Sequence, residues 1–243
     1  LVTQFGGGKT HTLTTLYHLI KNPGEAGNFS GVPDMLRDAG LYAIPTSKVA
    51  VFVGNAWDPR PGKETPWIDL ARQLAGDEGV ALLGPDAVES PPGTATLGEL
   101  FALAGGSVLV LCDEVLNFIN RHRKMADPFH AFLQNLTVAM TGTTRSAAVI
   151  SLPRSQVEMT DFDLKWQDKI TKVVRRVAKD LIANDEAEIS EVVRRRLFED
   201  LGDVQTRRTV AKTYADWCFE RSERLPAEWT SVDTSTSATN ARE

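Results

Sequence analysis

Hydrophobic residues in the first 160 positions form two kinds of run, and the two kinds alternate along the chain. Short apolar runs, with a polar residue only at or next to one end, lie at 48–54 (KVAVFVG), 107–112 (SVLVLC) and 147–152 (AAVISL). Runs of this length without polar interruption are typical of parallel strands that are buried on both faces. Helical patterns separate these runs. The pattern therefore predicts an α/β fold with a parallel sheet.

Helical spacing, in which apolar residues recur every three or four positions, predicts the elements between the strands. We expect helices over 12–20, 67–74, 97–103 and 128–140. Two stretches rich in glycine and proline, 22–47 and 76–93, are expected to be loops or insertions, with a weak helical piece at 35–39.

Strand patterns end near residue 160, and only helical patterns follow. We expect an amphipathic helix with an apolar stripe from Trp166 to Leu181, and further helices over about 185–201 and 204–221. The end of the chain, 230–243, is polar and lacks core-forming residues, so we expect it to be disordered. The predicted division is an α/β core at 1–156, a helical, lid-like subdomain at 157–225 and a tail at 226–243.

Composition narrows the class of protein. The chain has 243 residues, of which 42% are hydrophobic and 24% charged, and its net charge is -5. The acidic balance argues against a chain-wide nucleic-acid footprint, although the arginines at 194–196 could form a local patch. No apolar run approaches a membrane span and no signal peptide is evident, so we expect a cytoplasmic protein without a membrane partner. Cys112 and Cys218 are expected to be core residues in a reducing compartment.

A glycine loop opens the chain, which reads LVTQFGGGKTH over residues 1–11. Backbone amides of Gly6, Gly7 and Gly8 would cradle phosphates, Lys9 would reach the β- and γ-phosphates, and the Thr10 hydroxyl would bind Mg²⁺. The match is partial, because the full P-loop spacing has a glycine at position 3, where this chain has threonine. A glycine-rich turn before a helix is the alternative. The chain lacks an initiating methionine and begins inside the expected first strand, so we expect it to be a fragment of a longer protein.

Two adjacent acids, Asp113 and Glu114, end the apolar run at 107–112. Ligands of open α/β sheets bind at the carboxyl ends of the strands, so these acids predict a site. Asp113 would hold Mg²⁺, and Glu114 would orient and deprotonate the attacking water. The alternative is that the acids only favour the positive end of a following helix.

Three further residues are weaker candidates. Ser151, at the end of the run at 147–152, has the position of a γ-phosphate sensor, although a turn residue is the alternative. Arg196 falls on the apolar face of the helix expected at 185–201, so we expect it to meet nucleotide or a neighbouring subunit, or else an intramolecular carboxylate. Asp58 is either a site residue or, more simply, a turn former.

Several segments together resemble a known family: FGGGKTHTL, LVLCDE, EISEVVRRRLFEDL and TPWIDLARQLAG. They are similar to the prokaryotic ATP-binding proteins filed as domain of unknown function number 499. The resemblance implies a large AAA-like P-loop ATPase, of a kind often encoded beside DNA methyltransferases and helicases in anti-phage defence clusters. It implies ATP and Mg²⁺ at Gly8, Lys9, Thr10, Asp113 and Glu114, and the Lys-Thr-His ending adds His11 to the cofactor-binding set.

Three functions fit these features. The first is Mg²⁺-dependent ATP hydrolysis that drives a conformational change, with Lys9, Glu114, Ser151 and Arg196 as catalytic residues. The second is a switch or scaffold that binds ATP and barely hydrolyses it, and the third is a nucleic-acid-binding module. Glu114 favours the first, because a switch needs no positioned base. The expected partners are ATP, DNA or DNA-modifying proteins through the longer parent, and other copies of the chain in a homo-oligomer.

Overall fold

A computed structural model describes residues 2–3, 8–153, 159–179, 194 and 196–224 of the chain. The chain divides into two compact units, Leu1–Asp185 and Glu186–Glu243.

A parallel sheet lies at the centre of the first unit. Its strands β2 (Lys48–Val53), β3 (Val108–Asp113) and β4 (Ala147–Ile150) are ordered β2-β3-β4. A second parallel pair joins β1 (Val2–Thr3) to β5 (Leu152–Pro153). Ser151 alone separates β4 from β5, so the segment 147–153 pairs with β3 at its start and with β1 at its end. The predicted α/β fold with a parallel sheet is confirmed.

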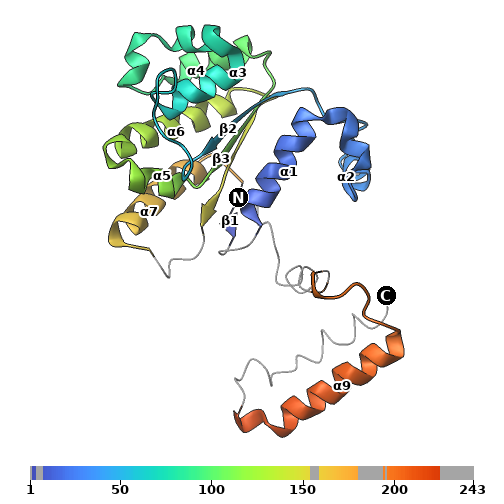
Figure 1. The fold of residues 1–243 in the computed structure, drawn as a ribbon. Helices are drawn as coiled ribbons and strands as arrows, with labels where there is room; N and C mark the ends of the chain where they lie inside the picture. Colours follow the sequence, from blue (N-terminus) through green and yellow to red (C-terminus); the bar gives the residue numbers. More distant parts are fainter. Residues whose placement is uncertain (1, 4–7, 154–158, 180–193, 195, 225–243) are drawn as a thin grey trace. The chain divides into compact units, whose positions relative to one another are not determined.

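Helices cover both faces of the sheet because alternate side chains point to opposite faces. Phe52 and Val110 face the larger core, which five helices complete (Figure 1). These helices are α3 (Pro66–Leu83), α4 (Thr94–Leu103), α5 (Val115–Arg121), α6 (Ala126–Thr141) and α7 (Asp161–Arg175). An aromatic cluster of Phe52, Trp57, Phe118 and Phe129, with ring centroids 4.6–6.4 Å apart, packs where the sheet meets α5 and α6.

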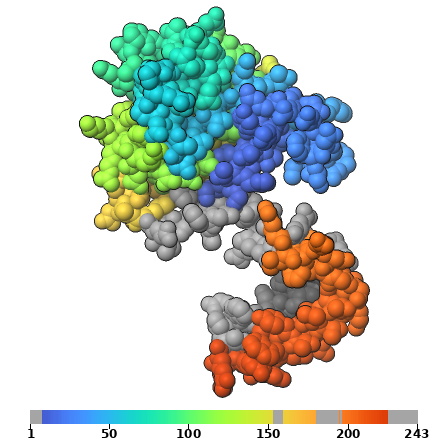
Figure 2. Space-filling model, in the orientation of Figure 1, coloured from blue at the N-terminus to red at the C-terminus, as the bar shows by residue number. Residues whose placement is uncertain are grey.

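The opposite face of the sheet carries α1 (Lys9–Lys21), whose Leu13 packs on Val49 and Leu111. The segment after α1 forms a 3-10 helix, Pro23–Asn28, and α2 (Val32–Asp38), and it projects beside the body of the unit (Figure 2). A pocket of about 440 Å³ lies between α1 and the strands, and Thr10 and Asp113 are among its lining residues. The pocket on this face of the sheet therefore includes two of the predicted site residues.

Two local predictions were wrong. The helix expected at 67–74 continues to Leu83, with a break at Ala75 and Gly76, so most of the loop expected at 76–93 is replaced by helix and a 3-10 turn at Pro85–Val88. Gly79 permits this path, because a Cβ there would lie 2.6 Å from the carbonyl oxygen of Ala71 and 3.1 Å from Leu100. Helix α5 was not predicted, because its seven residues are too few to distinguish a helix from a strand, although its four apolar residues, Val115, Leu116, Phe118 and Ile119, are buried at helical spacing.

Helix α7 begins with a capping box, in which the Thr160 hydroxyl accepts from the Asp163 amide and the Asp163 carboxylate accepts from the Thr160 amide. Of the predicted stripe, Trp166, Ile170 and Val173 are buried, and α7 packs against α5 and α6, but the helix ends at Arg175 and Val177 beyond it is exposed. Leu181 lies outside the described residues. The first compact unit includes α7, whereas the sequence predicts a boundary after residue 156.

The second unit contains α9 (Val204–Glu220), as the pattern over 204–221 predicted, and a 3-10 turn at Ser222–Arg224. Asp203 caps α9 by accepting from the Thr206 amide. Cys218 is buried, as is Cys112 in β3, and neither forms a disulfide. In the part of the chain that the structure describes, no helix has the length and apolar character needed to cross a bilayer.

Candidate nucleotide site

The glycine loop leads directly into α1. Gly8 is the N-cap of the helix with φ 76°, a left-handed conformation that suits glycine, and no side chain caps the first turn. The first turn contains no acidic residue. Amides at such a helix start are available to an anion, and the helix dipole favours one. Lys9 is half-buried at the first helical position, whereas Gly6 and Gly7 lie outside the described residues.

Three segments of the chain meet at the carboxylate of Asp113. The Thr10 hydroxyl donates to Oδ2 at 2.7 Å from α1, and the Ser151 hydroxyl donates to Oδ1 from the junction of β4 and β5. The backbone amide of Glu114 donates to Oδ1 at 3.0 Å. Asp113 is only 5% exposed and Ser151 only 2%, so the hydrogen bond between these two residues is sheltered from water, whereas Thr10 is exposed. The structure thus brings together residues that are 103 and 38 positions apart.

Ser151 is held by its backbone as well. Its amide donates to the carbonyl of Cys112 at 2.8 Å, which continues the pairing of β4 with β3 past the end of the strand. The Cys112 thiol points into the core, and burial, with a smaller contribution from the charge of Asp113, raises its pKa to about 12. Cys112 is therefore a core residue and not a nucleophile.

Glu114 has an unusual backbone. Its φ of 55° is the only positive value at a non-glycine position among the described residues. This left-handed conformation ends β3 and starts α5. Gly54, after β2, makes the turn possible, because a Cβ at Gly54 would lie 2.1 Å from the Glu114 carbonyl oxygen. Strained backbone of this kind persists where the surrounding structure fixes it, and it is common at functional sites.

The side chain of Glu114 is half-buried, and it does not cap α5. Its Oε2 accepts a hydrogen bond from Nδ2 of Asn117 at 2.6 Å. Burial raises the pKa of Glu114, the neighbouring charge of Asp113 raises it further, and Lys9 partly opposes both. A carboxylate with a raised pKa is a stronger base.

The donor set fits Mg²⁺ and a nucleotide phosphate. The Thr10 hydroxyl and the Asp113 carboxylate are hard oxygen ligands that already touch. No group of three or more His, Cys, Asp or Glu residues within the described ranges could hold a metal by itself. This is compatible with Mg²⁺, which is commonly bound by one or two protein ligands together with substrate phosphates and water.

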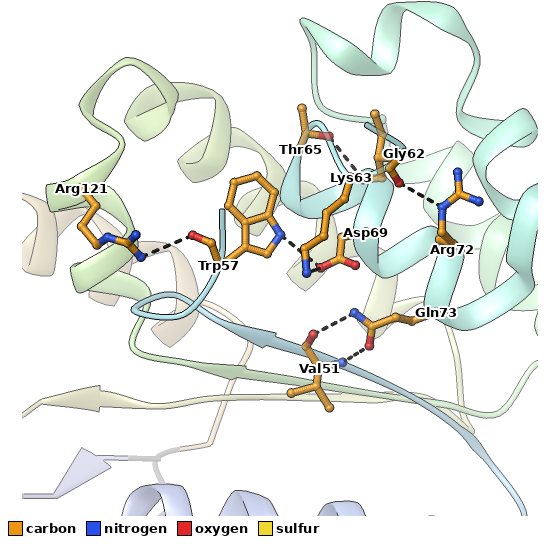
Figure 3. A network of polar contacts seen from close by, with 10 residues as sticks. Val51, Trp57, Gly62, Lys63, Thr65, Asp69, Arg72, Gln73 and Arg121 are labelled. Carbon is orange, nitrogen blue, oxygen red and sulfur yellow. Dashed lines mark hydrogen bonds and ion pairs between the residues drawn. The ribbon is translucent and has the colours of Figure 1, made fainter. Parts of the chain in front are cut away.

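A polar network fixes the loop after β2 (Figure 3). Arg121, at the end of α5, donates to the Asn55 carbonyl at 2.6 Å and pairs with Asp58 at 2.7 Å. Trp57 donates to the buried carboxylate of Asp69 at 3.1 Å, and Lys63 pairs with the same oxygen at 2.7 Å. The carboxylate of Asp58 therefore binds Arg121, which ties this loop to the helix that Glu114 begins.

Gln73 of α3 closes the outer edge of β2. Its side-chain oxygen accepts from the Val51 amide at 2.8 Å, and its side-chain nitrogen donates to the Val51 carbonyl at 2.9 Å (Figure 3). An amide side chain thus takes the place of another strand. Sequence reasoning missed this residue, and no local pattern distinguishes it from any other glutamine on a helix.

One predicted residue of the first unit is not brought to this cluster. His11 is exposed on α1, and its carbonyl accepts from the Thr15 hydroxyl at 3.0 Å. Arg196 is exposed in the second unit, so its proposed contact with nucleotide or with a neighbouring subunit stays a prediction. Most of the helix expected at 185–201 lies outside the described residues.

Comparisons with protein-family models, with curated proteins and with solved structures gave no match to this chain.

Proposed function

We propose that this protein is a P-loop ATPase that binds Mg-ATP and hydrolyses it. The observation that carries the proposal is the convergence of Thr10, Ser151 and the Glu114 amide on the buried carboxylate of Asp113. A hydroxyl after a glycine-lysine loop and an acid at a strand end are the two protein ligands that such enzymes use for Mg²⁺.

The strand pairing supports the same class. The segment that carries Ser151 pairs with both the acid strand β3 and the short strand β1 that precedes the glycine loop. This is the order expected of P-loop ATPases that have an extra strand between the loop strand and the acid strand. In such an order a polar residue at the end of the extra strand lies beside the acid, as Ser151 does.

Each residue then has a distinct task. Lys9 and the amides of the glycine loop bind the phosphates, while Thr10 and Asp113 hold Mg²⁺, which when bound offsets the charge of the transferred phosphoryl group. Glu114 accepts a proton from the attacking water. Ser151 orients Asp113 and senses the γ-phosphate.

At the family level, we propose an AAA-like ATPase of the type filed as domain of unknown function number 499. The segments FGGGKTHTL, LVLCDE, TPWIDLARQLAG and EISEVVRRRLFEDL support this. On this reading the protein works in the cytoplasm, within a defence or DNA-modification system. ATP hydrolysis in a homo-oligomer drives a conformational change, and Arg196 reaches nucleotide across a subunit boundary.

Thermal unfolding of the full chain tests the phosphate site. Mg-ATP at a hundred times its dissociation constant should stabilise the folded state by about 2.7 kcal/mol and raise Tm. Lys9→Ala should abolish that rise because the cation at the phosphates is lost. Lys21→Ala, at the other end of the same helix, is the matched control and should retain it. An unchanged rise in Lys9→Ala would overturn the phosphate assignment.

Phosphate release separates an ATPase from a switch that only binds ATP. Glu114→Gln keeps the size of the side chain and removes the base, so turnover should fall by about 10²- to 10⁴-fold while ATP stays bound. A wild-type protein that releases phosphate no faster than Glu114→Gln, with both binding ATP, would leave only the switch.

A further inference from the structure

Asn117 is the hydrogen-bond partner of the Glu114 carboxylate. Its Nδ2 donates to Oε2 of Glu114 at 2.6 Å. Glu114 is the N-cap of α5 and Asn117 is the third residue of that helix. A carboxylate at an N-cap usually accepts from a backbone amide of the first turn. Here it accepts from a side chain, and Oε1 takes no hydrogen bond from any residue that the structure describes.

The position of the donor is fixed by the core. The neighbours of Asn117 on either side, Leu116 and Phe118, are buried, and Phe118 is fully so. Asn117 itself is exposed. The packing of these neighbours holds the backbone that carries the amide, while the side chain can be changed without opening a cavity. Because Asn117 is exposed, core packing does not explain why its side chain contacts the Glu114 carboxylate.

The chemistry of the donor matters too. A lysine or arginine in this place would stabilise the carboxylate strongly and make it a weaker base. A neutral amide restrains the carboxylate and adds no charge. The contact thus limits the motion of the side chain at little cost to its basicity.

We infer that Asn117 is a positioning residue for ATP hydrolysis: it holds Glu114 by Oε2 and leaves Oε1 to accept the proton of the attacking water. This inference rests on the proposed ATPase function. Asn117 does not touch the reacting atoms, so it acts only through Glu114.

Kinetics of the full chain provide the first test. Asn117→Ala should lower kcat by about 10-fold or more and leave KM for ATP unchanged, because misplacing a catalytic group impairs the reaction without weakening phosphate binding. Asn117→Gln retains an amide donor and should recover part of the loss. Asn120→Ala is the matched control, since Asn120 lies one turn later on α5 and donates to Asp163 of α7 instead. Asn120→Ala should leave kcat within about 2-fold of the wild-type value.

Chemical labelling of the ATP-free protein provides a test that needs no turnover. A carbodiimide with glycine ethyl ester modifies accessible carboxyl groups, and mass spectrometry measures the extent at Glu114. Loss of the hydrogen bond should increase modification of Glu114 in Asn117→Ala and leave it unchanged in Asn120→Ala.

The outcomes distinguish this inference from the proposed function. If the wild-type chain hydrolyses ATP and Glu114→Gln does not, yet Asn117→Ala and Asn120→Ala behave alike in kcat and in labelling, the inference is wrong and the ATPase stands. A higher KM with unchanged kcat in Asn117→Ala would also overturn it. If the wild-type chain neither binds nor hydrolyses ATP, the proposed function fails, and the catalytic role of Asn117 fails with it.

Discussion

Replacing Ser151 by alanine removes a hydrogen bond to the buried carboxylate of Asp113. Two donors among the described residues, the Thr10 hydroxyl and the Glu114 amide, would remain. A hydrogen bond to a charged group contributes about 1.5–3 kcal/mol to stability. Ser151 is 2% exposed and Asp113 is 5% exposed, so water replaces the lost donor poorly. We therefore expect Ser151→Ala to lower the free energy of unfolding by about 2 kcal/mol.

Ser107 is the matched control, because it is a buried serine at the opposite end of the sheet. Its hydroxyl lies 2.7 Å from that of Ser47 and donates to the Arg145 carbonyl at 3.2 Å, and both of these partners are uncharged oxygen atoms. Ser107→Ala should lower the free energy of unfolding by about 1 kcal/mol. Urea denaturation of each variant, followed by circular dichroism at fixed pH, gives the two free energies.

A double-mutant cycle decides whether the effect of Ser151 passes through Asp113. In the Asp113→Asn background the acceptor has lost its charge, so Ser151→Ala should cost about 1 kcal/mol less than in the wild-type background. The reasoning is refuted if the two substitutions add within about 0.5 kcal/mol, or if Ser151→Ala costs no more than Ser107→Ala.

Two further predictions concern the supports of the site. Gly54→Ala would place a Cβ 2.1 Å from the Glu114 carbonyl oxygen, so urea denaturation should show that the free energy of unfolding falls by about 1–3 kcal/mol or more. Gly98→Ala in α4 is the control: a Cβ there has no atom within 4 Å, so the substitution should be neutral or stabilising. Equal effects of the two substitutions would contradict the close approach at Gly54. Burial raises the pKa of Asp163, but hydrogen bonds, chiefly from Thr160, outweigh it and hold the pKa below 3.8. The ionised Asp163 carboxylate with its Thr160 hydrogen bonds therefore stabilises the fold above pH 3.8, and this stabilisation is lost as the pH falls through the lower pKa of the folded state. The free energy of unfolding should consequently fall less steeply with decreasing pH in Asp163→Asn than in wild type.

The sequence determined the elements that have a local cause. Unbroken apolar runs predicted β2, β3 and β4 to within one or two residues, because strands buried on both faces contain no polar positions. The helical pattern over 12–20 predicted α1, which begins three residues earlier at Lys9, and the pattern over 204–221 predicted α9. The acids at the end of β3 predicted a site at the carboxyl edge of the sheet, since the strands of a parallel sheet share that edge, and binding there stays a prediction.

Only the tertiary structure decided how those residues meet. The hydrogen bonds from Thr10 and Ser151 to Asp113 span 103 and 38 residues, and no local pattern encodes such distances. The left-handed turn at Glu114 depends on Gly54 of a neighbouring strand, and the edge of β2 depends on Gln73 of α3. Helix α5 escaped prediction because seven residues are too few to establish a helical period, and the exposed Asn117 is distinguished only by its contact with Glu114.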